Sequence, residues 1–126
     1  MEREAVQPEG VATPKAPYSP VVVSGDLVLT AGQVAFDANG DVVADDIEAQ
    51  ARQVFDNLGR CLEAVGSSLG EVLKVNAFLA DFADFDAYNN VYEQYFSAPY
   101  PARTTVQAGL APGLRIEVEA VARKQS

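Results

Sequence analysis

The sequence predicts an α+β fold in which two helices cover one face of a sheet. Three observations predict it: strand-like segments rich in β-branched residues stand at both ends of the chain, two amphipathic helical segments lie between them, and one further strand-like segment separates those helices. A chain of 126 residues without an internal repeat has the size of one domain. We therefore expect residues 1–126 to form a single domain, with residues 1–14 as a polar leader whose order the sequence leaves open.

Extended structure is expected first along the chain. Pro14, Pro17 and Pro20 make their segment stiff and extended, which holds Tyr18 in one place. The Asn39-Gly40 pair is typical of a type I′ hairpin turn. The expected N-terminal strands, which are separated by turn residues, lie at 21–24, 27–32, 33–36 and 41–43.

Two helices are predicted by apolar residues at spacings of three and four. In residues 46–65, Asp45 with Glu48 resembles an N-terminal capping box and Gly66 is the expected stop. In residues 85–96, the tyrosines at helical spacing are expected to pack in the core. The helices' apolar positions are Ile47, Ala51, Val54, Leu58, Cys61, Leu62 and Val65 in the first, and Phe85, Tyr88, Val91, Tyr92 and Tyr95 in the second. Further strands are expected at residues 71–80, 104–108 and 114–123.

The strands at residues 21–23 and 27–29 are apolar at every position, as is typical of strands buried on both faces. Two helices cover only one face of the sheet. A second copy of the same chain is the simplest cover for the other face. The sequence therefore predicts an obligate homo-oligomer.

The composition excludes several kinds of chemistry. Because the chain has no histidine and one cysteine, it offers no imidazole base, no zinc site of the usual deaminase kind and no iron–sulfur cluster. It has no phosphate-binding loop or dinucleotide fingerprint, so we expect neither a metal nor a cofactor. A net charge of −9 without a basic cluster opposes nucleic-acid binding, and no apolar run is long enough for a membrane span. A cytoplasmic enzyme or small-molecule binding protein remains.

Two carboxylates on the last strand are candidates for chemistry. Alternation across residues 114–123 places Glu117 and Glu119 on the face opposite the apolar residues, which is the face assigned to the oligomer. Spacing alone favours a ladder of ion pairs with Arg115, Arg123 or a neighbouring subunit. The alternative is that one carboxylate orients or deprotonates a water molecule.

Arg103 is the second candidate, because it stands where a proline-rich segment meets a strand. A guanidinium at that boundary could grip a carboxylate or phosphate through two parallel hydrogen bonds. Taken alone, its position favours a surface ion pair with one of the 18 acidic residues. Two other features have a structural interpretation: Cys61 reads as a small core residue, and Ala31-Gly32-Gln33 as either a bulge or the end of a strand.

Short motifs recur in a distinctive order from about Ala16 to Ala122. They are Pro17-Tyr18-Ser19, Thr30-Ala31-Gly32-Gln33, Gln50-Ala51-Arg52-Gln53 followed by Asn57-Leu58, Leu73-Lys74-Val75, Asn89 before Tyr92, Pro101-Ala102-Arg103 and Ile116-Glu117-Val118-Glu119-Ala120. Together they resemble the RidA/YjgF family. The resemblance implies a chorismate-mutase-like mixed sheet and a homotrimer with a ligand cleft at each subunit interface.

The resemblance also implies a reaction, the hydrolysis of reactive 2-imino acids such as 2-iminobutanoate and 2-iminopropanoate to 2-keto acids and ammonia. By position, Arg103 would hold the substrate carboxylate and Glu117 would place the attacking water. The residues implied to line the cleft or bind substrate beside Arg103 are Tyr18, Gly32, Asn89 and Thr105. A protonated imine is already electrophilic, so orientation and a general base suffice.

Two positions depart from the family pattern, and both bear on substrate range. Many members have Ser where this chain has Ala31, and Cys where it has Thr105.

Two other functions stay open. A non-catalytic protein that binds a small carboxylate through Arg103 would need the same arginine, and an endoribonuclease activity ascribed to some relatives is disfavoured by the charge.

Overall fold

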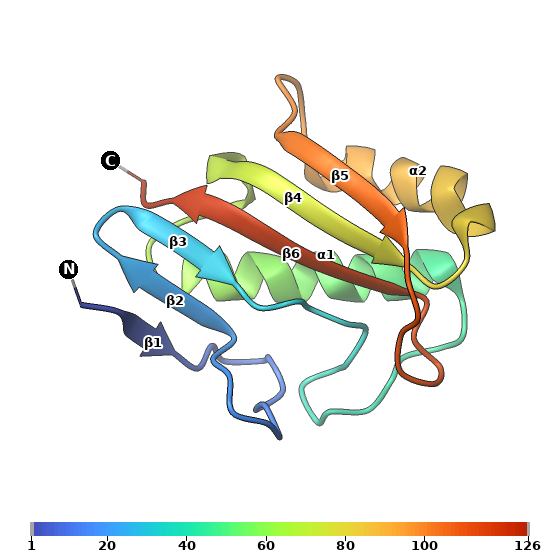
Figure 1. Ribbon diagram of the computed structural model, residues 1–126, viewed down its shortest axis with the longest axis horizontal. Coiled ribbons are helices and arrows are strands. Elements are labelled where there is room, and N and C mark those ends of the chain that lie inside the picture. Colours follow the sequence, from blue (N-terminus) through green and yellow to red (C-terminus); the bar gives the residue numbers. More distant parts are fainter. Residues whose placement is uncertain (1, 126) are drawn as a thin grey trace.

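The computed structural model describes residues 2–125 and contains one six-stranded sheet with two α-helices on one of its faces (Figure 1). The strands are β1 (Glu4–Val6), β2 (Val21–Ser24), β3 (Leu27–Thr30), β4 (Val72–Leu79), β5 (Ala102–Gln107) and β6 (Ile116–Arg123). The helices are α1 (Ile47–Glu63) and α2 (Phe85–Tyr95), with 3-10 turns at Leu69–Glu71 and Phe82–Asp84. The predicted α+β fold class is confirmed.

The strand order is β1-β2-β3-β6-β4-β5, which places the last strand in the middle of the sheet. Strands β4 and β5 are parallel and all other neighbours are antiparallel, so the sheet is mixed. The alternation predicted for β6 is present: Ile116, Val118, Ala120 and Ala122 are buried under the helices. Glu117 and Glu119 consequently lie on the open face.

The core lies between the sheet and the two helices. Helix α1 buries the apolar face that its spacing predicts, and Phe55 on that face meets the rings of Tyr88, Tyr92 and Phe96 at centroid distances of 5.8–6.3 Å. Such aromatic contacts stabilise a fold beyond the area that they bury. Cys61 is part of this core, and burial raises the pKa of its thiol to about 12, which leaves it inert.

Helix α1 begins one residue later than its capping pattern predicts. The N-cap is Asp46, whose carboxylate accepts a hydrogen bond of 2.9 Å from the backbone N–H of Ala49. Asp45 instead accepts from Arg115 at 2.7 Å. Gly66 has a φ of +81°, which is the left-handed conformation expected of a helix-terminating glycine.

The loop at Asn39-Gly40 differs from the predicted type I′ turn. A type I′ turn requires a positive φ at both central residues. Gly40 has a φ of +86°, but Asn39 does not have a positive φ, because within residues 2–125 only glycines do. The backbone N–H of Gly40 donates to Asp37, and Asp37 donates to Asp41, which closes a longer loop. The two flanking strands are reduced to a single bridge between Phe36 and Val42.

The segment that was predicted to be a polar leader takes part in the sheet. Residues Glu4–Val6 form the edge strand β1 and pair with β2 in antiparallel register, although all three side chains are exposed. Pro8 and Val11 are buried after it. Alternating apolar residues are absent from β1, so sequence periodicity could not reveal it.

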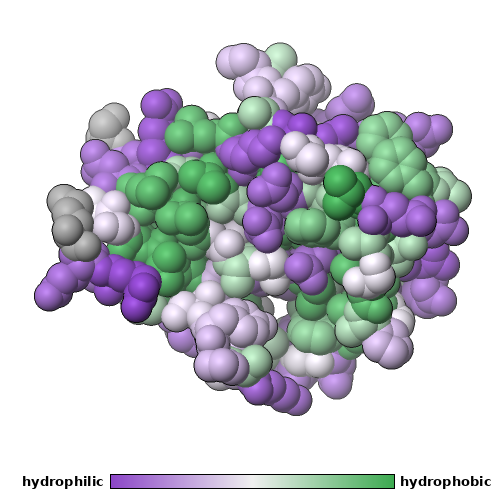
Figure 2. Space-filling view, viewed as in Figure 1, coloured by the Kyte–Doolittle hydropathy of each residue, from purple (hydrophilic) through white to green (hydrophobic). Residues whose placement is uncertain are grey.

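The face of the sheet opposite the helices is uncovered in the single chain. Figure 2 shows hydrophobic side chains gathered over β2 and β3 on this side, and Leu27 and Leu29 are 46% and 38% exposed. These strands are thus buried on one face only within one chain, which leaves the second face for the predicted oligomer. None of the helices within residues 2–125 is long and apolar enough to cross a membrane.

Candidate active site in two halves

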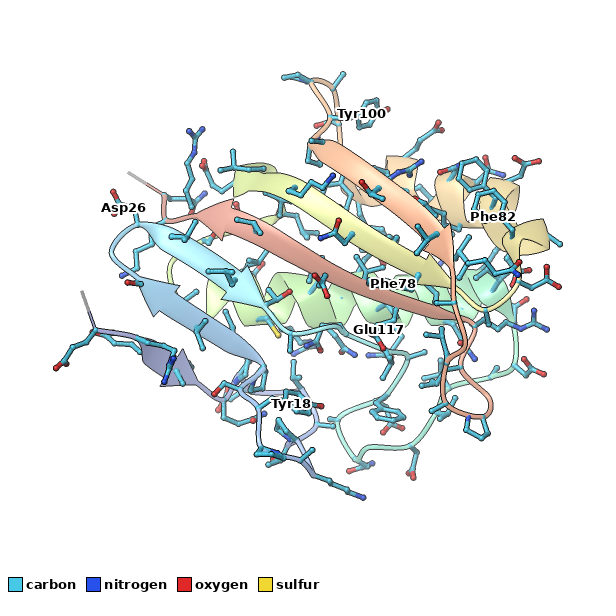
Figure 3. All side chains as sticks on the ribbon, viewed as in Figure 1. Tyr18, Asp26, Phe78, Phe82, Tyr100 and Glu117 are labelled. Carbon is cyan, nitrogen blue, oxygen red and sulfur yellow. The ribbon has the colours of Figure 1, made fainter. Side chains whose placement is uncertain are left out.

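The two residues predicted to carry the chemistry lie on opposite faces of the sheet. Arg103 on β5 pairs with Val75, a core residue, so its side chain points to the helix side. Glu117 on β6 pairs with Phe78 of β4, and both face the open side (Figure 3). One chain therefore holds two separate groups of site residues, which we call the arginine half and the glutamate half.

In the arginine half, aromatic rings enclose the guanidinium. The Cζ atom of Arg103 lies 4.7 Å from the ring centroid of Tyr92, 5.1 Å from that of Tyr88 and 5.8 Å from that of Phe85. Its Nη1 donates a 2.8 Å hydrogen bond to the side-chain oxygen of Asn89. Arg103 forms no ion pair within residues 2–125, so the interpretation as a surface salt bridge is wrong for the single chain.

The guanidinium opens onto a cavity of about 370 Å³ between α2 and the start of β5. The cavity lining consists of Asn89, Tyr92, Glu93, Tyr100, Pro101 and Arg103. Arg103 is its one cationic side chain. The arrangement suits a small anion, because an arginine held by rings and an amide keeps free N–H groups for a carboxylate.

Three buried hydroxyl groups near the Arg103 side chain have no hydrogen-bond partner in residues 2–125, those of Tyr88, Tyr92 and Thr105, and of these Tyr92 lines the cavity. Burial raises the pKa of Tyr92 to about 12 and raises that of Tyr88 as well. Both phenols are therefore neutral near pH 7 and serve as hydrogen-bonding groups only. Thr105 lies beside them because it follows Arg103 by two residues on the same face of β5.

In the glutamate half, Glu117 is free of ion pairs within residues 2–125. Arg115 binds Asp45 and Asp84 at 2.7 and 3.2 Å, and Arg123 binds Glu71 at 2.8 Å. The predicted ladder with these arginines is thus not formed in the chain. Burial, and then the nearby negative charge of Glu119, raise the pKa of Glu117. A carboxylate with a raised pKa is a stronger base than an ordinary glutamate.

Gly32 lies directly against Glu117. The pairing of β3 with β6 ends at Leu29 and Val121 and resumes at Gln33 and Val118, so the β3 side contains one extra residue. This is a bulge, one of the two alternatives that the sequence leaves open. A Cβ atom added at Gly32 would overlap the Glu117 carboxylate. A larger residue at this position would therefore force the Glu117 carboxylate or the bulge to move.

Tyr18 belongs to the glutamate half. It lines a small cavity of about 30 Å³ together with Gly32, Gln33 and Asn57, and its side chain is 55% exposed. Gly32 therefore lies beside both Tyr18, with which it lines this cavity, and Glu117, whereas Asn89, Thr105 and Arg103 belong to the other half.

Asn57 was missed as a site residue. It is 2% exposed, and its amide donates to the carbonyls of Val34 and Phe36 at 3.1 and 2.9 Å, which fixes the segment after Gly32. Its sequence signal is a polar side chain on the apolar face of an amphipathic helix.

Glu93 and Tyr100, which line the cavity of the arginine half, were also missed. Glu93 stands one helical turn after Asn89 on the face that meets this cavity.

No group of three or more His, Cys, Asp or Glu side chains within residues 2–125 converges as a metal site would require.

Comparisons with known proteins identify the family. The family described as Endoribonuclease L-PSP matches residues 10–124. The 3-aminoacrylate deaminase RutC of Acinetobacter baylyi is 40% identical over 97% of this chain and 98% of its own. The 2-iminobutanoate/2-iminopropanoate deaminase of Homo sapiens is 38% identical over 89% of this chain and 87% of its own. The crystal structure of the E. coli YjgF gene product superposes with a TM-score of 0.90 at 34% identity, covering 97% of this chain and 99% of its own. The chain belongs to the RidA/YjgF family.

Proposed function

We propose that the protein hydrolyses small 2-imino acids, namely 2-iminobutanoate and 2-iminopropanoate, to 2-keto acids and ammonia. The observation that carries the proposal is the unpaired guanidinium of Arg103 at a cavity of about 370 Å³. In a chain of net charge −9, an arginine that forms no ion pair within residues 2–125 is suited to an external carboxylate. The cavity's size and single cation favour a small monoanion.

A complete site requires two copies of the chain. Arg103 and Glu117 lie on opposite faces of one sheet, so they cannot hold the same small molecule within a single copy. The uncovered face that carries Glu117 is the face on which the sequence predicts a partner. In the proposed homotrimer, Arg103 of one copy and Glu117 of its neighbour meet at each of the interfaces.

The chemistry then follows from the two halves. Arg103 holds the substrate carboxylate, and the Glu117 carboxylate takes a proton from water as the water oxygen bonds to C2 of the iminium. The C2=N double bond becomes a single bond in the resulting carbinolamine. Glu117 returns the proton to nitrogen. As the C2–N bond breaks, the carbinolamine hydroxyl gives its proton to the Glu117 carboxylate and the C2=O bond forms. The 2-keto acid and ammonia leave, and the remaining proton passes from Glu117 to ammonia. General-base assistance of this kind typically contributes about 10²–10⁴-fold.

The relatives support this class of substrate. One is named a 3-aminoacrylate deaminase and another a 2-iminobutanoate/2-iminopropanoate deaminase. All three compounds are small carboxylates with a hydrolysable carbon–nitrogen bond, which is what an arginine half and a glutamate half can serve together.

A non-catalytic carboxylate-binding protein is the second candidate. The observation that favours it is that the arginine half is formed without Glu117, so binding does not depend on the base. Ribonuclease activity is disfavoured, since the net charge of −9 on each copy triples in a trimer and repels a phosphate backbone.

The test is complementation between two inactive variants. With 2-iminobutanoate generated in situ, we expect wild-type protein to accelerate keto-acid formation and Arg103→Ala and Glu117→Gln to abolish the acceleration separately. After the two variants are unfolded, mixed in equal amounts and refolded, about a quarter of the sites in random trimers combine both intact residues. Recovery near that fraction supports the shared site.

Two outcomes would contradict the proposal. Mixed oligomers, verified by native mass spectrometry, that recover no activity would exclude a site shared between copies. Binding of 2-ketobutyrate by wild type without any acceleration would establish the non-catalytic alternative.

A further inference from the structure

The orphaned hydroxyls beside Arg103 require an explanation. Tyr88 is fully buried, and its hydroxyl and that of Thr105 have no hydrogen-bond partner within residues 2–125. Buried hydroxyls are almost always paired in native proteins because leaving them unpaired costs free energy. Two such groups next to one functional guanidinium point to a hydrogen-bonding role there.

Tyr88 lies close to both Arg103 and Thr105. Its ring centroid is 5.1 Å from Cζ of Arg103, and Thr105 follows Arg103 on the same face of β5. The Thr105 hydroxyl and the positive Arg103 side chain both act against the rise in the pKa of Tyr88 that burial causes, which agrees with the closeness of all three. Tyr92 faces the same guanidinium, but its hydroxyl has no comparable contact with Thr105.

The donors of Arg103 leave room for such a contact. A guanidinium carries five N–H groups. One of them is bound to Asn89, and a bidentate carboxylate would take two more. Donors therefore remain for the oxygen of the Tyr88 hydroxyl, which has no partner within residues 2–125 and whose ring centroid lies 5.1 Å from the guanidinium carbon.

We infer that Tyr88 and Thr105 are positioning residues for Arg103, an inference that rests on the proposed carboxylate-binding function. When a carboxylate binds, Arg103 donates to the Tyr88 oxygen, and the Tyr88 hydroxyl donates to Oγ1 of Thr105. These two bonds fix the plane in which the guanidinium meets the ligand. The pair therefore sets the affinity for the carboxylate, while the chemical step depends on Glu117 of the neighbouring copy.

A purely structural role for these hydroxyls predicts the opposite result. Phenylalanine fills the place of Tyr88 and valine that of Thr105 with little change in shape, and each removes an unpaired buried hydroxyl. If the hydroxyls only filled space, Tyr88→Phe and Thr105→Val would leave binding unchanged and stability equal or higher. The positioning role predicts weaker binding in variants that are no less stable.

The experiment is calorimetric titration of 2-ketobutyrate into the full-length oligomer, together with steady-state kinetics. We expect Tyr88→Phe and Thr105→Val each to raise Kd and KM roughly three- to tenfold, with kcat within about twofold of wild type. Because the two hydroxyls act in series, the double variant should bind no more weakly than the weaker single variant. Thr105→Ser, which keeps the hydroxyl, should restore wild-type affinity.

Tyr95→Phe is the matched control. It removes a hydroxyl from the same helix, and this hydroxyl donates a 3.0 Å hydrogen bond to the Asp56 carboxylate outside the cavity. Its Kd should equal that of wild type. An unchanged Kd in Tyr88→Phe, or effects of the two single variants that multiply in the double, would overturn the inference while Arg103→Ala still loses binding. If wild type itself bound no 2-ketobutyrate, the proposed function would fail and the inference with it.

Discussion

The two halves of the site are constructed in different ways. In the arginine half, three aromatic rings and an amide of the same chain surround the guanidinium of Arg103 and leave most of its N–H groups free. In the glutamate half, Glu117 stands on an open sheet face, pressed against the bulge at Gly32 and beside the like charge of Glu119. The arginine half is formed within a single chain, whereas Glu117 in the glutamate half has no positively charged partner within residues 2–125.

This difference separates binding from chemistry. A preformed cationic pocket provides affinity and orientation for a carboxylate, which is what proximity catalysis needs. A carboxylate that is partly desolvated and repelled by its neighbour is less stable in its ionised form, which makes it a better proton acceptor. The sheet itself keeps the two groups apart within one copy, so the proposed reaction requires a second copy.

The largest effect is expected from the arginine half. Arg103→Ala removes the only cation of the cavity, and with it the anchor that orients the substrate. We expect kcat/KM for 2-iminobutanoate to fall by about 10³-fold or more, to the uncatalysed level. Arg103→Lys should recover little, because an ammonium cannot form two parallel bonds to a carboxylate. If Arg103→Ala kept its activity with the oligomer intact, Arg103 would not be the residue that binds the substrate carboxylate.

Glu117→Gln should separate chemistry from binding. We expect kcat to fall by about 10²-fold while 2-ketobutyrate binds as before, because the amide keeps the shape and loses the base. The folded protein raises the pKa of Glu117, so its ionised form is destabilising above that pKa, and the neutral amide should raise Tm slightly at pH values above it. A variant that loses binding in parallel with kcat would assign Glu117 to ligand binding instead.

The sequence predicts local features of this molecule well and relations between distant segments poorly. The two-residue period of residues 114–123 correctly places Glu117 and Glu119 on one face, and the helical spacing of residues 46–65 correctly identifies the buried side of α1. Capping was misplaced because Asp45 and Asp46 are equally suitable by type, and the choice depends on Arg115, a partner far along the chain.

The division of the site could not be predicted from the residues alone. It depends on the parallel pairing of β4 with β5 and on the central position of β6, and neither is encoded in any local pattern. The same is true of Tyr88, whose helical spacing predicts a core residue and gives no sign that its hydroxyl faces Arg103 and Thr105. Local sequence reports which face a side chain takes, whereas the strand order decides which side chains share a site.

Gly32→Ala tests the close approach in the glutamate half and should have an intermediate effect. A methyl group at this position overlaps the Glu117 carboxylate, so either that side chain or the bulge has to move. We expect kcat to fall roughly tenfold, with affinity for 2-ketobutyrate retained within about threefold, since a displaced base is impaired without loss of the anchor. Gly70→Ala is a matched control, because an added Cβ there meets only Ser68 Oγ at 3.7 Å, an ordinary contact. Equal kinetics in the two variants would show that the contact with Gly32 has no catalytic importance.

The smallest expected effect concerns the pH dependence. Glu117 acts as a base only when it is ionised, so kcat should fall as the pH drops through its pKa, which burial and the charge of Glu119 raise above the ordinary value of 4.5. Glu119→Gln removes the like charge, which makes ionisation of Glu117 easier and lowers its pKa. The acid limb of the kcat profile should therefore move to lower pH, while kcat on the plateau above that limb stays near that of wild type. The measurement is kcat between pH 4 and 8 for both. A limb that stays in place would mean that another group controls it, and a limb that moves to higher pH would mean that Glu119 stabilises the ionised base.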